Sequence, residues 1–399
     1  MSIFPRILYT AGVSSEQYRT THLHKVWLSF QQQPQPLDLF LKNYYQNNRS
    51  LGSKDRKFLG DLLYKAIRWK GLIDQLAPKE CTADEWLKLA RTVNPSSHSH
   101  NEELPMHLRL SMPKNFFALL EEQWGTEEAV QLCTTLNQNA PTTARVNELK
   151  ISRPELLKRL SSHFEVQETP FSPSGFFFSK RLPIQTLPEF REGLFEMQDE
   201  GSQLLAMLVD AKPGDHVLDY CAGSGGKTLA FAHRLKGKGQ IYLHDIRKGA
   251  LERAKRRLRR AGIQNAQQLP SGKKLFGKMD WVLVDVPCTG TGTYRRNPDL
   301  KWKFTNDFLE GLVTLQREIV KNALAYLRPG GSLVYATCSL LKEENEEQVA
   351  HFISELPLEL QGAPFRTHPL PGGMDGFFGA VLNMRPLDIS NGLNKRLEV

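Results

Sequence analysis

Cysteine is scarce in this chain of 399 residues, which contains only five at scattered positions. No two of them have the CxxC spacing of a zinc site, so we predict no metal site. Five is an odd number, and this argues against a disulfide framework and favours a reducing, cytoplasmic compartment. Long hydrophobic runs are also missing, so no membrane span is expected. The first residues lack the charged start, apolar core and cleavage site of a signal peptide.

Acidic residues are in deficit, with 43 Asp and Glu against 52 Lys and Arg, which gives a net charge of +9. This balance favours an anionic partner such as nucleic acid, although many basic proteins bind none. The hydrophobic content of 40% and the charged content of 24% are those of an ordinary globular protein. The length predicts two or three domains.

Residues 1–138 show helical patterns and predict an all-helical domain. Ser53 is the predicted N-cap of one helix, with Asp55 in its first turn. An apolar stripe at helical spacing follows, formed by Phe58, Leu59, Leu62, Leu63, Ala66 and Ile67. Two further helices are predicted at Asn115–Trp124 and Glu127–Gln138.

Residues 139–200 predict a small α+β module. A strand is expected around Thr143–Asn147, and Ser152 is expected to cap a helix that has Pro154 in its first turn. Strand-like segments follow at Phe164–Gln167 and Phe176–Ser179. Residues 388–399 are predicted to be a loose polar tail.

Strands and helices alternate from residue 201 to residue 387, and this rhythm predicts an α/β, doubly wound parallel sheet. The expected strands are His216–Tyr220, Gln240–His244, Trp281–Asp285, Ser332–Ala336 and Phe377–Asn383. A crossover helix is expected over Phe308–Leu327, between the third and fourth of these strands.

Two cysteines follow buried-strand patterns in this last domain. Cys288 ends the run Asp-Trp-Val-Leu-Val-Asp-Val-Pro-Cys, and Cys338 ends the run Ser-Leu-Val-Tyr-Ala-Thr-Cys. Ligands of an open parallel sheet bind beyond the carboxyl ends of its strands. We therefore expect both thiols at one site, although 50 residues separate them in the sequence. A single buried cysteine is usually inert, but two at strand ends are hard to explain by packing.

A glycine-rich turn follows the first strand of the domain, in Asp219-Tyr-Cys-Ala-Gly-Ser-Gly-Gly-Lys-Thr. Small residues let the backbone approach a ligand closely, and the start of a helix offers free N–H groups. The turn matches neither the P-loop nor the GxGxxG pattern. Asp245, at the end of the second strand, is suited to ribose hydroxyls or is simply a solvated strand end. Together these features favour an adenosine-bearing ligand.

The helix expected over Arg247–Arg260 carries eight Lys or Arg and one Glu. Ala250, Leu251, Ala254, Leu258 and Ala261 would form its buried stripe. We interpret the basic residues mainly as a solvated face, with phosphate contacts as a secondary role.

Several motifs together resemble the Fmu/Sun family of RNA (cytosine-5)-methyltransferases. They include Asp285-x-Pro-Cys-Thr-Gly-Thr-Gly-Thr, Arg295-Arg-Asn-Pro-Asp, Thr337-Cys-Ser followed by Glu344-Asn-Glu, Asp375-Gly-Phe-Phe, Gln198-Asp-Glu-x-Ser-Gln and the glycine-rich turn. The resemblance covers residues 139–385, and Gly52 to Trp69 resembles the NusB-like helical domain of bacterial members. It implies a Rossmann-like methyltransferase sheet behind an RNA-binding helical domain.

The resemblance also implies a mechanism. Cys338 would be the nucleophile that adds to carbon-6 of a cytosine, after which carbon-5 attacks the methyl group of S-adenosylmethionine. Cys288 would assist the breakdown of the covalent adduct, and Asp285 would bind the cytosine edge. The target base must leave its stack, so single-stranded or remodelled RNA is the expected substrate.

The resemblance implies a cofactor site formed by Cys221, Ala222, Gly223, Ser224, Gly225, Gly226, Lys227, Asp245 and Asp285. The sequence departs from the family pattern at two places. Ser271 stands where an Asp near the adenine is usual, and Gly223-Ser224 replaces Ala-Pro.

Ribosomal RNA is the favoured substrate by analogy with NusB-bearing members, and transfer RNA is the nearest variant. A DNA-type enzyme would use Cys288 as the nucleophile, and the Thr-Cys-Ser motif argues against it. A non-catalytic RNA-binding or ribosome-assembly factor is the alternative from another class. The expected protein is a cytoplasmic monomer.

Overall fold

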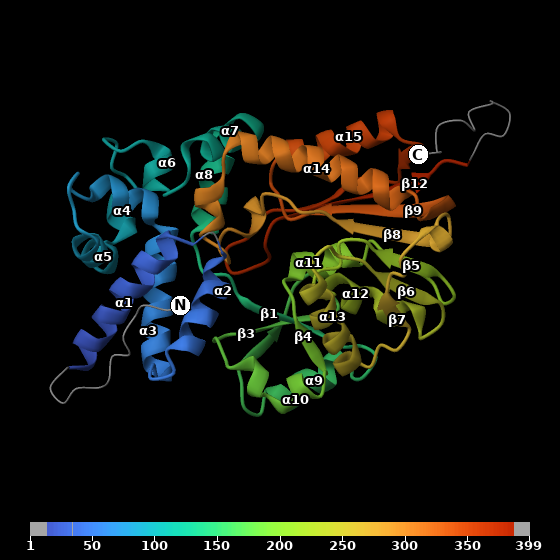
Figure 1. The fold of residues 1–399 in the computed structure, drawn as a ribbon, viewed down its shortest axis with the longest axis horizontal. Helices are drawn as coiled ribbons and strands as arrows, with labels where there is room; N and C mark the ends of the chain where they lie inside the picture. Colours follow the sequence, from blue (N-terminus) through green and yellow to red (C-terminus); the bar gives the residue numbers. More distant parts are fainter. Residues whose placement is uncertain (1–13, 34, 387–399) are drawn as a thin grey trace. The chain divides into compact units, whose positions relative to one another are not determined.

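The computed structural model describes residues 14–33 and 35–386, and the predicted tail at 388–399 lies outside them. The chain divides into two compact units (Figure 1). One contains the chain up to Asn137 together with Tyr294–Phe304, and the other contains Gln138–Thr293 and the chain from Thr305 onward.

The first unit is all-helical. Its helices are α1 (Ser15–Gln31), α2 (Leu37–Asn47), α3 (Ser53–Arg68), α4 (Lys70–Leu76), α5 (Ala83–Thr92), α6 (Met106–Arg109), α7 (Lys114–Trp124) and α8 (Thr126–Leu136). The stripe predicted for α3 is confirmed, because Leu59, Leu62, Leu63, Ala66 and Ile67 are all buried. The predicted N-cap was wrong by one residue. Ser53 is the first residue of the helix, and the Asp55 carboxylate accepts a hydrogen bond from the backbone N–H of the N-cap, Gly52.

The segment Tyr294–Phe304, which the sequence places in the sheet domain, packs with these helices. The buried Lys301 ammonium donates to the carbonyls of Arg68 and Ser111, at 2.7 and 2.9 Å, and to the Asn137 side chain at 2.9 Å. The indole of Trp302 donates to the Ile67 carbonyl at 2.7 Å. Helical residues therefore hold a segment that follows the Cys288 motif directly in the chain.

Lys301→Met is expected to lower the free energy of unfolding by about 3 kcal/mol. The substitution keeps the apolar stem but leaves three buried acceptors without a donor, and each unsatisfied group costs roughly 1–3 kcal/mol before relaxation. Urea unfolding of the whole chain measures the change. Lys88→Met, at an exposed position of α5, is the matched control. Equal stabilities of the two variants would show that Lys301 does not hold the segment.

The second unit begins with a four-stranded antiparallel sheet in the order β2-β3-β1-β4. Its strands are β1 (Thr142–Val146), β2 (Val166–Glu168), β3 (Gly175–Phe178) and β4 (Phe195–Met197). Helix α9 (Arg153–Leu160) packs on this sheet and has the predicted Ser152 cap, and α10 (Pro188–Arg191) precedes β4. Ala144, Phe176 and Phe195 contribute to the core of this module.

The larger sheet has the order β10-β12-β9-β8-β5-β6-β7, with β11 paired to β12. Its strands are β5 (His216–Asp219), β6 (Gln240–Leu243), β7 (Ala266–Gln268), β8 (Met279–Asp285), β9 (Leu327–Thr337), β10 (Leu358–Leu360), β11 (Phe365–Thr367) and β12 (Phe377–Met384). The five strands from β5 to β9 are parallel, and the last three run antiparallel to their neighbours. The predicted doubly wound α/β fold is confirmed, but the strand expected at Phe377–Asn383, observed as β12, runs antiparallel to β9 and does not continue the parallel sheet.

Alternate residues of each strand face opposite sides of this sheet, and helices cover both sides (Figure 1). Val217 and Leu283 face the core beneath α11 (Glu200–Ala206), α12 (Gly226–Phe231) and α13 (Lys248–Ala261). Leu218 and Val284 face the core beneath α14 (Asn306–Leu324) and α15 (Glu346–Glu355). Both faces are buried, which explains the nearly continuous hydrophobic runs of these strands. Across the described residues, no helix is long and apolar enough to cross a membrane.

Candidate active site

The site lies where the strand order of the larger sheet reverses. From β5 the chain proceeds outward through β6 and β7, and then returns to place β8 and β9 on the other side of β5. Asp219 of β5 pairs with Leu283 of β8, and Asp285 of β8 pairs with Ala336 of β9. The residues that follow these three strands therefore meet at the reversal point, where open α/β sheets bind ligands.

Cys288 and Cys338 lie side by side at this edge, as expected from their positions after adjacent strands. Their Sγ atoms are 3.3 Å apart, and the Cys338 N–H lies 3.4 Å from the Cys288 sulfur. The hydrogen bond with Cys338, together with burial, raises the pKa of Cys288 well above its usual value. Cys288 is therefore held as a neutral thiol that can donate to the sulfur of Cys338.

Lys227 and Asp285 form an ion pair beside the thiols, with Nζ and Oδ2 2.5 Å apart. Burial by itself would lower the pKa of Lys227, but the carboxylate of Asp285 outweighs it and the net pKa is raised. Negative charge on the Cys338 sulfur would raise the pKa of Lys227 further. The ammonium is thus available to stabilise negative charge on Cys338.

Glu344 joins the loops that carry the two cysteines. Its carboxylate accepts hydrogen bonds from the N–H of Thr289 at 2.9 Å, from the Thr289 hydroxyl at 2.5 Å and from the Gln316 amide at 2.9 Å. Ser339, next to Cys338, also hydrogen-bonds to it. Burial raises the pKa of Glu344. Because one buried carboxylate binds residues adjacent to both thiols, it fixes their separation.

The same loops contact the Asp375-Gly motif. A Cβ atom on Gly292 would lie 2.3 Å from the carbonyl oxygen of Gly376, so only glycine fits there. The N–H of Gly376 donates to the Gly292 carbonyl at 3.0 Å. A segment that is distant in the sequence therefore supports the loop after Cys288.

The glycine-rich turn shapes a cradle at the start of α12. Gly223 and Gly225 have φ angles of +54° and +76°, a backbone conformation that favours glycine. Asp219 accepts a hydrogen bond from the Thr228 hydroxyl at 2.6 Å, and its other oxygen, although buried, has no hydrogen-bond partner among the described residues. A close backbone and an unsatisfied acceptor are features that fit a polar ligand.

Burial raises the pKa of Asp219 from 3.8 to about 7. Between these values the folded protein binds more protons than the unfolded chain, so this residue's contribution to stability is lost as the pH rises from about 4 to 7. The free energy of unfolding is expected to fall by about 4 kcal/mol over this range because of Asp219, and Asp219→Asn is expected to abolish this decrease. Urea unfolding of both proteins at several pH values measures the difference. Parallel pH profiles would show that folding does not raise the pKa of Asp219.

Asp245 contacts the glycine-rich turn and Arg247, the N-cap residue of α13. It accepts a hydrogen bond from the N–H of Gly223 at 2.8 Å and is paired with the Arg247 guanidinium at 2.9 Å. Burial raises its pKa, but the hydrogen bonds from Arg247 outweigh this effect and the net pKa is lowered. The Arg247 side chain is 68% exposed, so it can move aside for a hydroxyl pair.

Ile246 is a residue that the sequence reasoning missed. It follows Asp245 at the strand end and is 89% exposed, which is unusual for a large hydrophobic side chain. The sequence did contain a signal for this residue, because an apolar side chain directly follows the acidic residue after the second strand. Ser271, where the sequence lacks the usual Asp, is exposed beyond the end of β7. Ile246 therefore offers an apolar surface for a planar ring at this edge.

Arg145, whose role the sequence left open, is buried in the module. Its guanidinium donates to the Leu229 carbonyl of α12 at 2.8 Å and to the Gln198 side chain at 3.0 Å. Burial lowers its pKa to about 10, so it remains charged at neutral pH. Its contacts attach the module to the helix that follows the glycine-rich turn.

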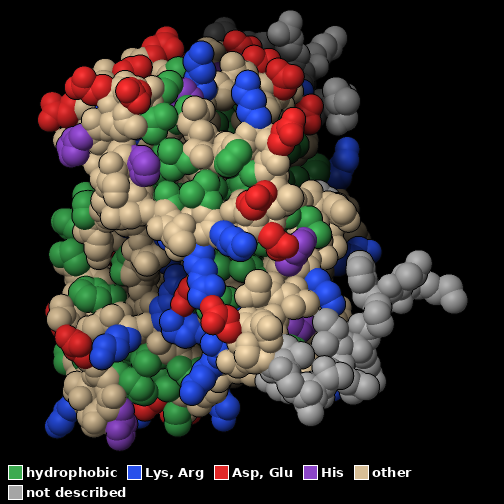
Figure 2. All heavy atoms as spheres, turned by 90° about the vertical axis from the view of Figure 1, so that its left-hand side faces the viewer, with side chains coloured by type: hydrophobic (Ala, Val, Ile, Leu, Met, Phe, Trp, Pro, Cys, Tyr) green, Lys and Arg blue, Asp and Glu red, His purple; other side chains and the backbone are tan. Residues whose placement is uncertain are grey.

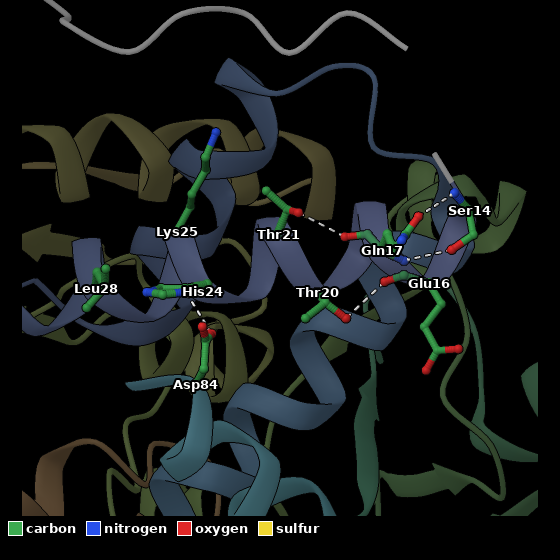
Figure 3. A pocket seen from close by; sticks show the side chains of 9 residues that line it. All are labelled: Ser14, Glu16, Gln17, Thr20, Thr21, His24, Lys25, Leu28 and Asp84. Atoms are coloured by element: carbon green, nitrogen blue, oxygen red, sulfur yellow. Dashed lines mark hydrogen bonds and ion pairs between the residues drawn. The ribbon is translucent and has the colours of Figure 1, made fainter. Parts of the chain in front are cut away.

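A separate surface depression of about 670 Å³ lies on the helical unit over α1 (Figure 3). Its polar groups are largely satisfied internally. Ser14 and Gln17 cap the helix, Thr20 and Thr21 bond to carbonyls one turn earlier, and His24 pairs with Asp84 at 2.7 Å. These contacts explain the side chains without a ligand.

The reversal-point cradle on a doubly wound sheet, with an acidic residue just after the second strand, is typical of Rossmann-like folds that bind an adenosine-bearing ligand, and the family models identify the class as a methyltransferase. Residues 206–383 match the family model described as 16S rRNA methyltransferase RsmB/F, and residues 112–185 match the ferredoxin-like domain of RsmF/B-like methyltransferases. The chain belongs to this family, and its cofactor is S-adenosylmethionine.

Individual relatives agree with this assignment. The chain is similar to a probable ribosomal RNA small subunit methyltransferase B of Synechocystis sp., at 32% identity over 70% of this chain and 68% of that protein. The corresponding Enterobacter sp. protein is 31% identical over 81% of this chain and 75% of its own length. A solved methyltransferase homologue from Pyrococcus horikoshii has 30% identity and a TM-score of 0.60, and the match covers 69% of this chain and 97% of that one.

Proposed function

We propose that this protein methylates carbon-5 of a cytosine in ribosomal RNA through a covalent cysteine adduct. The observation that carries the proposal is the pair of thiols 3.3 Å apart beside the Lys227–Asp285 ion pair. Methylation of an exocyclic nitrogen or a ribose hydroxyl needs no such pair. Carbon-5 of cytosine does need a nucleophile, because the aromatic carbon is unreactive until a thiolate adds at carbon-6.

Cys338 is the nucleophile in this proposal. Its sulfur lies within electrostatic reach of the Lys227 ammonium and within hydrogen-bonding distance of the neutral Cys288 thiol. Sulfur bonds to carbon-6, and the electron pair of the 5,6 double bond moves toward carbon-5. Bound S-adenosylmethionine supplies the methyl group that carbon-5 takes. Loss of the proton from carbon-5 and expulsion of the Cys338 thiolate restore the double bond.

The other site residues orient and release the substrate. Asp285 binds the cytosine edge by accepting a hydrogen bond from the exocyclic amino group, which orients the ring for the addition. Cys288 assists the breakdown of the adduct by donating a hydrogen bond to the departing Cys338 sulfur, and water takes up the carbon-5 proton. On the cofactor side we assign the backbone from Cys221 to Gly226, the ribose partner Asp245 and the apolar surface of Ile246.

Support for ribosomal RNA comes from the names of the relatives, which are ribosomal RNA small subunit methyltransferases. The net charge of +9 fits a polyanionic substrate. Figure 2 shows lysine and arginine side chains gathered near the centre of one face, with acidic side chains mainly along its upper rim. We retain the NusB-like, RNA-binding assignment of the helical unit, a monomeric state and a cytoplasmic location as parts of this proposal.

The test uses S-adenosylmethionine labelled in its methyl group and unmodified pools of ribosomal and transfer RNA. After the reaction the RNA is digested to nucleosides. Label in 5-methylcytidine from the ribosomal pool is the expected result. Label in another nucleoside would overturn the cytosine assignment, and label confined to the transfer RNA pool would overturn the substrate.

A further inference from the structure

Helix α13 carries a stripe of four arginines that the chemistry above does not use. Arg253, Arg256, Arg257 and Arg260 follow the spacing i, i+3, i+4 and i+7, which places them on one side of the helix. Arg253 and Arg256 are exposed, and no carboxylate within the described chain forms an ion pair with either of them. The stripe spans about 10 Å along the helix axis.

A buried carboxylate orients the inner half of this stripe. Glu196 of β4 is only 2% exposed and is paired with Arg257, at 3.1 Å, and with Arg260. The Arg260 guanidinium also lies over the ring of Phe190, 3.9 Å from its centroid. The Nε atom of Arg260 is buried and has no hydrogen-bond partner among the described residues. Arg257 and Arg260 are therefore held in place, unlike the mobile side chains of a solvated face.

The module and α13 are locked together at this point. A Cβ atom on Gly193 would lie 2.3 Å from the carbonyl of Arg260, and the Asn147 amide donates to the carbonyls of both Gly193 and Ala261 at 2.8 Å. Lys150 bridges the carbonyls of Glu192 and Arg260. The residues just before β4 are thus fixed against the end of α13.

A depression of about 620 Å³ opens between these elements, which are neighbours in Figure 1. Phe190, Met197 and Arg191 line it together with Arg257 and Arg260. Arg191 is exposed and donates through Nε to the Gln185 carbonyl at 3.2 Å. Three guanidinium groups face one carboxylate, so the depression has a positive charge and suits an anion.

We propose that Arg191 and the arginine stripe of α13 bind the phosphodiester backbone of the RNA substrate. This inference rests on the proposed function and adds the surface on which the RNA lies. The exposed guanidinium groups of Arg253 and Arg256 can each bind phosphate oxygens through two parallel hydrogen bonds, while Arg257 and Arg260, held by Glu196, supply fixed positive charge beside them. Backbone contacts of this kind position an RNA without reading its sequence.

One residue connects this surface to the cofactor turn. Arg257 donates to both the carbonyl and the hydroxyl of Ser224 at 2.8 Å while it is paired with Glu196. A phosphate that draws on Arg257 therefore acts on the loop that lies under the cofactor. Because the arginine surface contacts the glycine-rich turn of the active site, its ligand is more consistent with the RNA substrate than with an unrelated polyanion.

The test measures RNA binding by fluorescence anisotropy across a range of salt concentrations, using a ribosomal RNA fragment that the intact protein methylates. Arg253→Gln with Arg256→Gln removes two charges from the stripe without touching Arg257. We expect an affinity about tenfold lower, and a dependence of log affinity on log salt that is less steep by about 1.4, since each contact to single-stranded RNA contributes about 0.7. Arg191→Gln is expected to act in the same direction.

The matched control is Lys236→Gln with Lys238→Gln. These exposed lysines precede β6 at the amino edge of the sheet, away from the carboxyl ends, and should leave affinity and salt slope unchanged. Equal losses in both double variants would mean a general charge effect and overturn the proposal, as would no loss in the stripe variant. Methylation at saturating RNA separates this inference from the proposed function. The stripe variants should still methylate RNA under that condition if they are weakened only in binding the RNA backbone. A protein that methylates no RNA would instead refute the proposed function.

Discussion

Cys338→Ala is expected to abolish methyl transfer, with a loss of at least about 10³-fold in kcat/KM. Without this sulfur nothing adds to carbon-6, and the neutral Cys288 thiol does not replace it. Cys288→Ala is expected to act differently, because addition and methyl transfer can proceed while release fails. It should accumulate a covalent protein–RNA complex that survives denaturing electrophoresis. Single-turnover methylation and gel migration measure the two effects.

Cys81→Ala is the matched control for both substitutions, since Cys81 is a partly buried free thiol of the helical unit. It should keep full activity and form no lasting adduct. The reverse pattern, with the adduct formed only when Cys338 is replaced, would assign the nucleophile to Cys288, as in a DNA-type enzyme. Full activity of the Cys338 variant would rule out covalent catalysis by this residue.

Glu344→Ala is expected to lower kcat about 100-fold and the free energy of unfolding by about 3 kcal/mol. It removes the acceptor shared by Thr289, Gln316 and Ser339, so the loops beside the two cysteines lose their common support. The buried donors left behind cause the loss of stability. The loss of positioning causes the loss of rate, while the affinity for S-adenosylmethionine should change little.

Steady-state kinetics, cofactor titration and urea unfolding together test this prediction. Glu347→Ala removes an exposed carboxylate three residues further along the chain and is the matched control. If Glu344→Ala lowers stability but leaves kcat unchanged, then the carboxylate supports the fold without positioning the thiols.

The sequence predicted the larger sheet well because each of its central strands is buried on both faces. The hydrophobic runs ending at Asp285 and Thr337 marked β8 and β9, and their parallel pairing brought Cys288 and Cys338 together as expected. The short strands β4, β7, β10 and β11, of three residues each, left no readable period and were missed. Their stability comes from pairing with longer neighbours.

Other features depend on contacts between segments that are distant in the sequence. The hydrogen bonds of Lys301 to Arg68, Ser111 and Asn137 involve positions more than 160 residues away, and no local pattern predicts them. Six of the eight basic residues predicted for α13 are exposed, which confirms a mainly solvated face, but Arg257 and Arg260 are held by Glu196, which comes from another module. Lys227 was assigned to the cofactor by its motif alone. Its ion pair with Asp285, on the substrate side, appears only in the fold.

The most direct test of covalent catalysis uses the intact protein with RNA containing 5-fluorocytosine at the methylated position. After methyl transfer, carbon-5 then carries fluorine in place of the proton, so the sulfur cannot be expelled and the adduct persists. Proteolysis, nuclease digestion and mass spectrometry identify the modified peptide. We predict a methylated fluoronucleotide on the peptide that contains Cys338. The same mass on the Cys288 peptide, or no adduct while unsubstituted RNA is methylated, would contradict the assignment of Cys338 as the nucleophile.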